Sequence, residues 1–280
     1  MKSKIKTLVE LLEDDDVETS AHVMSEILSS DRTAWRIIGR LQESSSGIIR
    51  KKAHQMQFAA NSRARRRKLA TRLSEQNLNL IKGLIELHLQ WFDEDSEDFV
   101  MEEWDRFKNF SGNWCPNSIE NLSEMMSSLG MESSEFDELE CVDYCIGEVT
   151  STGRGADFML CIVARILARD AGWNPSIVAT DAGFCVYNER TKTGLFPAKK
   201  WAMAKCEISN NVRRWSDLML LNLAANSMLF CSIAGGQLRY SYMIGACIAE
   251  SIGKKPSEIL PYPLGGSVDF PEKPSKNNTR

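Results

Sequence analysis

Apolar residues recur at helical spacing through the first half of the chain. Ile5, Leu8, Leu11 and Leu12 share one face of a helix expected over 5–14. The same period predicts helices over 17–28, 32–43 and 47–62, two within 76–110, one from Asn117 or Ser118 to about 130, one over 134–149, and one after the turn "STGRGAD". The chain therefore begins as a succession of helices.

The period changes after Gly172. Residues 176–181 and 184–189 are short β-branched or aromatic runs separated by Ala-Gly, a pattern typical of a hairpin, and 194–201 is a candidate third strand. From 215 to 252 the pattern is helical again, with a turn at Gly235-Gly236. We therefore predict an α+β fold that is mostly α, with a small antiparallel sheet and a C-terminal helical hairpin.

A faint internal repeat suggests how the chain is divided. The tetrads "AHVM" (21–24) and "AHQM" (53–56) recur 32 residues apart, as in HEAT-like helix pairs, which places His22 and His54 as packing residues. The predicted organisation is HEAT-like helices over 1–75, an α+β core over 76–210, further helices over 211–265 and a disordered polar tail over 266–280.

The amino-acid composition indicates that the chain can form a substantial hydrophobic core. Of 280 residues, 43% are hydrophobic, and neither a long apolar run nor a signal peptide is evident, so we expect a cytoplasmic protein without membrane contact. We expect the eight cysteines to be free thiols, because disulfides are rare in the cytoplasm. Cys141 and Cys145 would share a helix face, but two further zinc ligands are lacking, so we expect no metal and no cofactor.

Charge is strongly segregated along the chain. Nine basic residues and no acidic one lie over 50–72, whereas 92–105 and 131–148 are acidic. The basic run proper consists of Arg63, Arg65, Arg66, Arg67 and Lys68. A solvated helix face is the favoured interpretation; contact with nucleic acid phosphates is an alternative, and attraction between copies leaves a homo-oligomer open.

The segment "STGRGADFMLCIVARILARDAG" and the strands that follow it resemble the core of the transglutaminase-like superfamily. The likeness is closest to a bacterial subgroup that joins this core to tetratricopeptide-like helices, and it covers roughly 76–262. In that superfamily a nucleophilic cysteine opens the helix, a histidine lies on the next strand, and an aspartate on the following strand orients the histidine. The helix N-terminus favours a thiolate and the histidine shares its proton.

The three catalytic places of that superfamily hold other residues here. Counting back from "ARDAG", the cysteine position falls at about Asp157, the histidine position at Phe184 and the aspartate position at Phe196. Asp157 cannot replace a thiolate as an acyl-transfer nucleophile without a base or a metal. The resemblance therefore implies a degenerate member without transglutaminase-type catalysis.

The positions of the histidines also argue against catalysis by the core. His22, His54 and His88 all precede residue 89, so the core has none of its own to act as a base. His88 is interpreted as a partly buried structural residue. Cys161, one turn after Asp157, and Cys185, on the neighbouring strand, should lie near Asp157, and we interpret both as core thiols.

Three charged residues near the helix start remain as candidate ligand-binding groups. Arg154, Asp157 and Asp181 either cap the helix and the turn or line a residual cleft, and capping is favoured. The leading hypothesis is a catalytically inactive protein that acts as a protein-binding scaffold or regulator. The alternatives are a cysteine-dependent amide hydrolase or acyl transferase with a rearranged dyad of Cys161 or Cys185 with His88, and a nucleic-acid-binding helical protein.

Overall fold

The computed structural model describes residues 7–8, 11–13, 16–29, 31–112, 114–206 and 214–260. Helices dominate these residues and the larger of two small sheets is antiparallel, which confirms an α+β protein that is mostly α. The α-helices are α2 (Val17–Ser29), α3 (Asp31–Gln42), α4 (Gly47–Arg72), α5 (Leu80–Trp91), α6 (Glu97–Ser111), α7 (Ile119–Ser128), α8 (Ile146–Thr152), α9 (Asp157–Asp170), α10 (Asp217–Ala234) and α11 (Leu238–Ser251). The strands are β1 (Glu132–Ser133), β2 (Arg154–Gly155), β3 (Ser176–Thr180), β4 (Gly183–Asn188), β5 (Thr193–Phe196) and β6 (Ala202–Lys205).

Five of the described α-helices begin where the sequence supplies a capping side chain. The side-chain oxygen of the residue before the helix accepts a hydrogen bond from a backbone N–H in the first turn, which would otherwise lack a partner. These caps are Ser46 for α4, Asn79 for α5, Ser96 for α6, Ser118 for α7 and Ser216 for α10. The helix starts are thus encoded locally.

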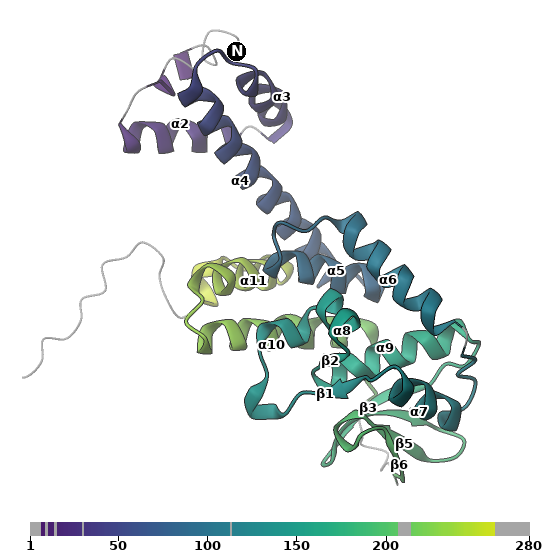
Figure 1. The fold of residues 1–280 in the computed structure, drawn as a ribbon. Helices are drawn as coiled ribbons and strands as arrows, with labels where there is room; N and C mark the ends of the chain where they lie inside the picture. Colours follow the sequence, from purple (N-terminus) through teal and green to yellow (C-terminus); the bar gives the residue numbers. More distant parts are fainter. Residues whose placement is uncertain are drawn as a thin grey trace, which may run out of the picture.

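The N-terminal helices form a module with its own small core. Val23 and Ile27 of α2, Ile38 of α3 and Met56 of α4 are buried together. Figure 1 shows this module standing away from the rest of the protein, joined to it by α4. The expected end of that helix at residue 62 is wrong, because α4 continues to Arg72 without a breaking residue and carries the whole basic run.

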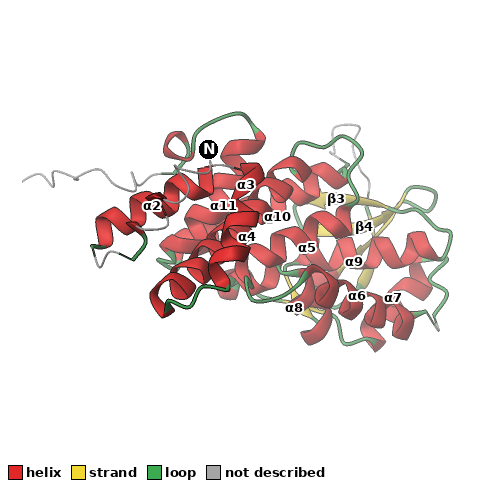
Figure 2. Ribbon diagram, turned by 90° about the horizontal axis from the view of Figure 1, so that it is seen from above, coloured by secondary structure: helices red, strands yellow, loops and turns green. Residues whose placement is uncertain are grey.

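The main body is built around α5. This helix packs against α4, α6, α8, α10 and α11, and Gly83 lets α10 approach so closely that a Cβ there would lie 2.6 Å from Leu221 Cδ2. One continuous core runs from Leu69 to Ile248. The expected segments 76–210 and 211–265 therefore share a core, and Figure 2 shows their helices gathered beside the sheet.

The main sheet is a meander with the order β3-β4-β5-β6, antiparallel throughout, and α9 packs on β3 and β4. The predicted hairpin is confirmed, with Ala179 paired to Phe184. The third strand ends earlier than expected, at Phe196, because Pro197 opens a 3-10 turn. The sequence interpretation missed β6, an exposed edge strand without apolar alternation.

The helix expected over 134–149 is wrong. Two 3-10 turns, Phe136–Glu138 and Cys141–Tyr144, precede α8. The Asp143 carboxylate accepts hydrogen bonds from the Glu140 backbone N–H at 2.7 Å and from the Ser134 hydroxyl. These local bonds compete with helix formation. Cys141 and Cys145 are both buried, but they do not share the face of one helix.

Of the described helices, α10 is long and apolar enough by length and composition to cross a membrane, contrary to the expectation that the chain has no such segment. Its apolar character also has a packing explanation, because Leu220, Leu221, Ala224 and Met228 are buried in the main core. The expected polar tail, and half of the helix expected over 5–14, lie outside the described residues.

Candidate functional site

Asp157 joins the start of α9 to the sheet. It is the first residue of the helix, and its Oδ1 accepts a hydrogen bond from the Phe158 backbone N–H at 2.7 Å. Its Oδ2 accepts another from the Phe184 backbone N–H of β4 at 3.0 Å. Burial raises the pKa of this carboxyl in spite of both bonds. Asp157 therefore lies in the first turn of α9, one residue after the N-cap position of Ala156, and its carboxylate ties that turn to a neighbouring strand.

The two other places assigned from the resemblance hold packed aromatic rings. The Phe184 ring lies 5.6 Å from the Phe158 ring and 5.2 Å from the Trp215 ring, measured between centroids. Phe196 on β5 is buried, with the Lys199 ammonium 5.3 Å from its ring centroid. These rings contribute packing at positions where a cysteine-dependent enzyme would need a base and its orienting group.

An open depression lies beside Asp157. It has a volume of about 350 Å³ and is lined by residues 133–137, Leu139, Asp157 and Ala198. Phe136 at its edge is 90% exposed. Its lining contains neither cysteine nor histidine, and it presents three carboxylates, two serines and apolar surface for contact.

Cys161 and Cys185 lie near Asp157, as expected, and both are fully buried. Burial raises the pKa of the Cys161 thiol far above its usual value, and the nearby Asp157 and Cys185 add to the effect. Burial, followed by the neighbouring Cys206 thiol, raises the pKa of Cys185 to about 12. A thiol of this kind stays protonated at neutral pH and cannot act as a nucleophile.

His88 is a buried structural residue in α5. Its Nε2 lies 3.0 Å from Asp95 Oδ2, and its ring stacks on Phe92 with centroids 4.8 Å apart. A Cβ at Gly147 of α8 would lie 2.7 Å from its Cε1, so α8 closes over the ring. Burial lowers the pKa of the imidazole, although Asp95 opposes the shift. None of these contacts involves Cys161 or Cys185, so the described structure does not bring a cysteine–histidine dyad together.

The other two histidines were interpreted wrongly. His22 and His54 are exposed, whereas the repeat had placed them as packing residues. The core contacts come instead from neighbouring positions, Val23 in α2 and Ala53 and Met56 in α4. A four-residue match in sequence does not fix which side of a helix faces its neighbours.

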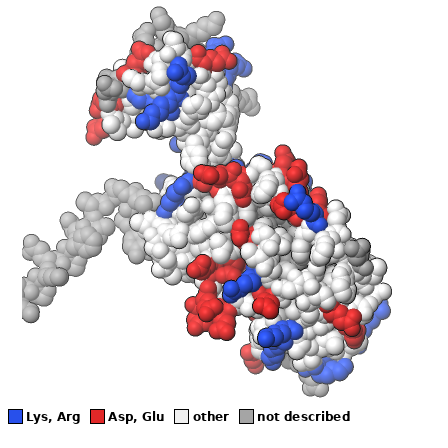
Figure 3. Space-filling model, in the orientation of Figure 1, with Lys and Arg blue, Asp and Glu red and all other residues white. Residues whose placement is uncertain are grey.

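Arg154 and Asp181 do not join Asp157 in one site. Arg154 is exposed, with its Nη2 3.9 Å from Glu138 Oε2, and it lines a separate acidic depression with Glu140, Asp143 and Glu148. Asp181 is exposed in the turn between β3 and β4. Figure 3 shows acidic side chains gathered on the main body and mixed charge on the N-terminal module.

The basic run is largely engaged within the chain. Arg65 donates hydrogen bonds to the backbone carbonyls of Asp93 and Asp95, each at 2.6 Å. Lys68 pairs with Glu97 at 2.8 Å, and the Arg66 guanidinium lies 5.8 Å from the Tyr242 ring centroid. Arg63 is half-buried and Arg67 is exposed. The run therefore docks α4 onto the body more than it forms a solvated face.

The sequence interpretation missed two polar residues of α5. Glu86 and Gln90 are 5% and 0% exposed, in the same helix as His88. Their signal was visible in "LIELHLQWF", where Glu86, His88 and Gln90 alternate with leucines in a strongly apolar helix. Within the described part of the chain, no group of three His, Cys, Asp or Glu side chains is placed to hold a metal ion.

Comparison of the chain with protein-family models, with curated proteins and with solved structures finds no match.

Replacing Asp157 by alanine should lower the free energy of unfolding by about 1–3 kcal/mol, because the backbone N–H groups of Phe158 and Phe184 lose their acceptor. Urea denaturation followed by circular dichroism measures this change. Asp181→Ala is the matched control, and it should stay within about 0.5 kcal/mol of the wild type. Equal stability of the two variants would show that Asp157 does not tether the helix to the sheet.

The free energy of unfolding should fall as the pH drops below about 6.5. The unfolded chain protonates His88 near its ordinary pKa of 6.5, whereas the folded protein holds the imidazole neutral to a lower pH, so stability is fully present above 6.5 and is lost below it.

In a series of urea titrations from pH 5 to pH 8, His88→Gln should remove up to about 1.4 kcal/mol per pH unit of this dependence. His54→Gln, at an exposed position, should keep the wild-type slope. If both variants keep that slope, the buried imidazole is not its source.

Proposed function

We propose that this protein is a catalytically inactive relative of the transglutaminase-like superfamily that acts by binding another protein, as a scaffold or regulator. The observation that carries the proposal is Asp157, hydrogen-bonded to two backbone N–H groups at the place where the resemblance requires a nucleophilic cysteine. Phenylalanines at the two companion positions, 184 and 196, add to the argument.

The state of the thiols supports a function without covalent chemistry. Cys161, Cys185, Cys145 and Cys247 are buried, and burial raises the pKa of each of them. His88 is held by Asp95, away from the cleft beside Asp157. The acyl-transfer alternative would need a cysteine and a base facing the same accessible space.

The N-terminal module is the part best suited to meet a partner. It stands away from the body on α4 (Figure 1), and Trp35 of α3 and Ile48 of α4 are each 45% exposed. Exposed tryptophan is typical of the residues that contribute most to protein–protein binding. The nucleic-acid alternative is weaker, because Arg65, Arg66 and Lys68 already contact other parts of the chain.

Native-state alkylation with iodoacetamide across pH 5 to 9, with each site quantified by mass spectrometry, tests whether the protein is catalytic. We expect exposed Cys115 to be alkylated in the folded protein and Cys161 and Cys185 to react only after unfolding, because water does not reach these two thiols. Rapid reaction of either buried cysteine below pH 7 would contradict the proposal and favour the cysteine-dependent enzyme.

Replacing Trp35 and Ile48 together by alanine tests the binding role. A protein that co-purifies with the full-length chain should, once identified and purified, bind it in a calorimetric titration, and the double variant should weaken that binding by about tenfold or more because it removes exposed apolar contact. Phe110→Ala, at an exposed position on α6, is the control and should leave the affinity unchanged. Equal affinity of all three chains would show that the module is not the binding surface.

A further inference from the structure

A small polar cavity lies where α4 meets α5 and the beginning of α6. It has a volume of about 210 Å³ and is lined by Arg65, Lys68, Glu86, Leu89, Ser96 and Glu97. Since one water occupies about 30 Å³ in the liquid, the space corresponds to roughly seven waters. A ligand that fills it must therefore be small, with only a handful of non-hydrogen atoms.

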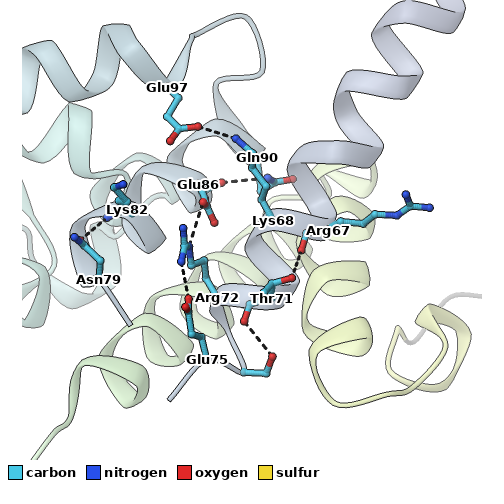
Figure 4. Close-up of polar contacts among 11 residues, drawn as sticks. Arg67, Lys68, Thr71, Arg72, Glu75, Asn79, Lys82, Glu86, Gln90 and Glu97 are labelled. Carbon is cyan, nitrogen blue, oxygen red and sulfur yellow. Dashed lines mark hydrogen bonds and ion pairs between the residues drawn. The ribbon is translucent and has the colours of Figure 1, made fainter. Parts of the chain in front are cut away.

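Two buried oxygen acceptors on one face of α5 lack a partner in the described structure. Glu86 Oε1 accepts from Arg72 Nε at 3.3 Å, but its Oε2, on a side chain that lines the cavity, has no hydrogen bond. Gln90, one turn later, donates from Nε2 to the Glu86 backbone carbonyl at 3.1 Å and leaves its Oε1 without a donor. Figure 4 shows both side chains beside Lys68. Buried acceptors left in this way favour a ligand that brings N–H donors.

The charges around the cavity restrict the ligand further. Among the lining residues, Arg65 and Lys68 supply two positive charges, and Glu86 and Glu97 supply two negative ones. A simple cation would face Arg65 and Lys68, and a simple anion would face the Glu86 carboxylate. A molecule that carries both an ammonium and a carboxylate group complements both sides.

The basic side chains of the cavity carry more N–H groups than their hydrogen bonds in the described structure use. Arg65 uses one N–H from each of two guanidinium nitrogens for the carbonyls of Asp93 and Asp95, out of the five N–H groups of its side chain. Lys68 lies at the rim, where its ammonium pairs with Glu97 and remains 57% exposed. Both can turn a donor to a carboxylate without leaving a buried group unpaired.

We propose that this cavity binds a small zwitterion of the amino acid class. Its ammonium group donates to the Glu86 carboxylate, and its carboxylate accepts from Arg65 and Lys68. Burial raises the pKa of the Glu86 carboxyl even beside Arg72, so this group gains from a further cationic partner. The site is independent of the cleft beside Asp157 and of the proposed partner surface.

The test is calorimetric titration of the full-length protein with glycine, L-alanine, L-serine and 4-aminobutyrate, each checked by the shift in Tm. At least one of them should bind saturably and raise the Tm. Three matched probes separate the contributions: glycine betaine keeps both charges but has no N–H, n-propylamine lacks the carboxylate, and propionate lacks the ammonium. Each should bind about tenfold more weakly or not at all.

Glu86→Gln keeps the shape of the site and removes its negative charge, so it should weaken binding of the amino acid by about tenfold or more. Arg72 keeps Glu75 as its partner at 2.6 Å, which favours a folded variant. Glu103→Gln on α6, which interrupts an exposed pair with Arg106, is the control and should bind as the wild type does. Lys68→Met, at the rim, gives a second loss-of-binding variant should Glu86→Gln fail to fold.

Three results would overturn the proposal. Failure of all four amino acids to bind would mean that water alone fills the cavity. Equal binding of glycine betaine would show that the unpartnered oxygens play no part. Wild-type affinity in both Glu86→Gln and Lys68→Met would place the ligand elsewhere.

Discussion

The burial of α5 on all sides is the constraint on which the main body depends. Its leucines and isoleucines pack with the neighbouring helices in one core, but Glu86, His88 and Gln90 are buried beside them. A buried polar group without a partner is costly, so the surrounding elements must supply partners. Arg72 at the end of α4 pairs with Glu86, and Asp95 after α5 pairs with His88. The positions of α4 and of the segment between α5 and α6 follow from these needs.

The segment between α5 and α6 also holds α4, which carries the N-terminal module, against the body. Arg65 of α4 binds the backbone carbonyls of Asp93 and Asp95, while the Asp93 carboxylate pairs with Arg239 of α11. Arg239 also lies 5.6 Å from the Phe58 ring centroid of α4. Polar and cation–π contacts thus fix the direction in which α4 leaves the body, and with it the reach of the module. The cavity that Glu86 lines is at this junction.

The carboxylates of Asp157 and Glu86 are both at least partly buried, but they differ in how many of their oxygens have hydrogen-bond partners. Asp157 satisfies both oxygens with backbone N–H groups and so has a complete structural role. One oxygen of Glu86 has a hydrogen-bond partner; the other is buried without one, on a side chain that lines a cavity. The first arrangement accounts for the absence of a nucleophile where the resemblance would place one, and the second leaves a group that can still act on a ligand. Binding is the common element of both proposals.

The sequence by itself determined the elements whose signals are local: the capped helices, the 176–189 hairpin and the hairpin of α10 and α11, because side-chain period and caps act within one or two turns. The resemblance proposed from the sequence places Asp157 and two phenylalanines where that superfamily has its catalytic residues. Only the tertiary structure decided the length of α4, the 3-10 turns before α8, the exposure of His22 and His54, and the partners of Glu86, His88 and Gln90. These depend on contacts between residues far apart in the chain, which neither period nor composition records.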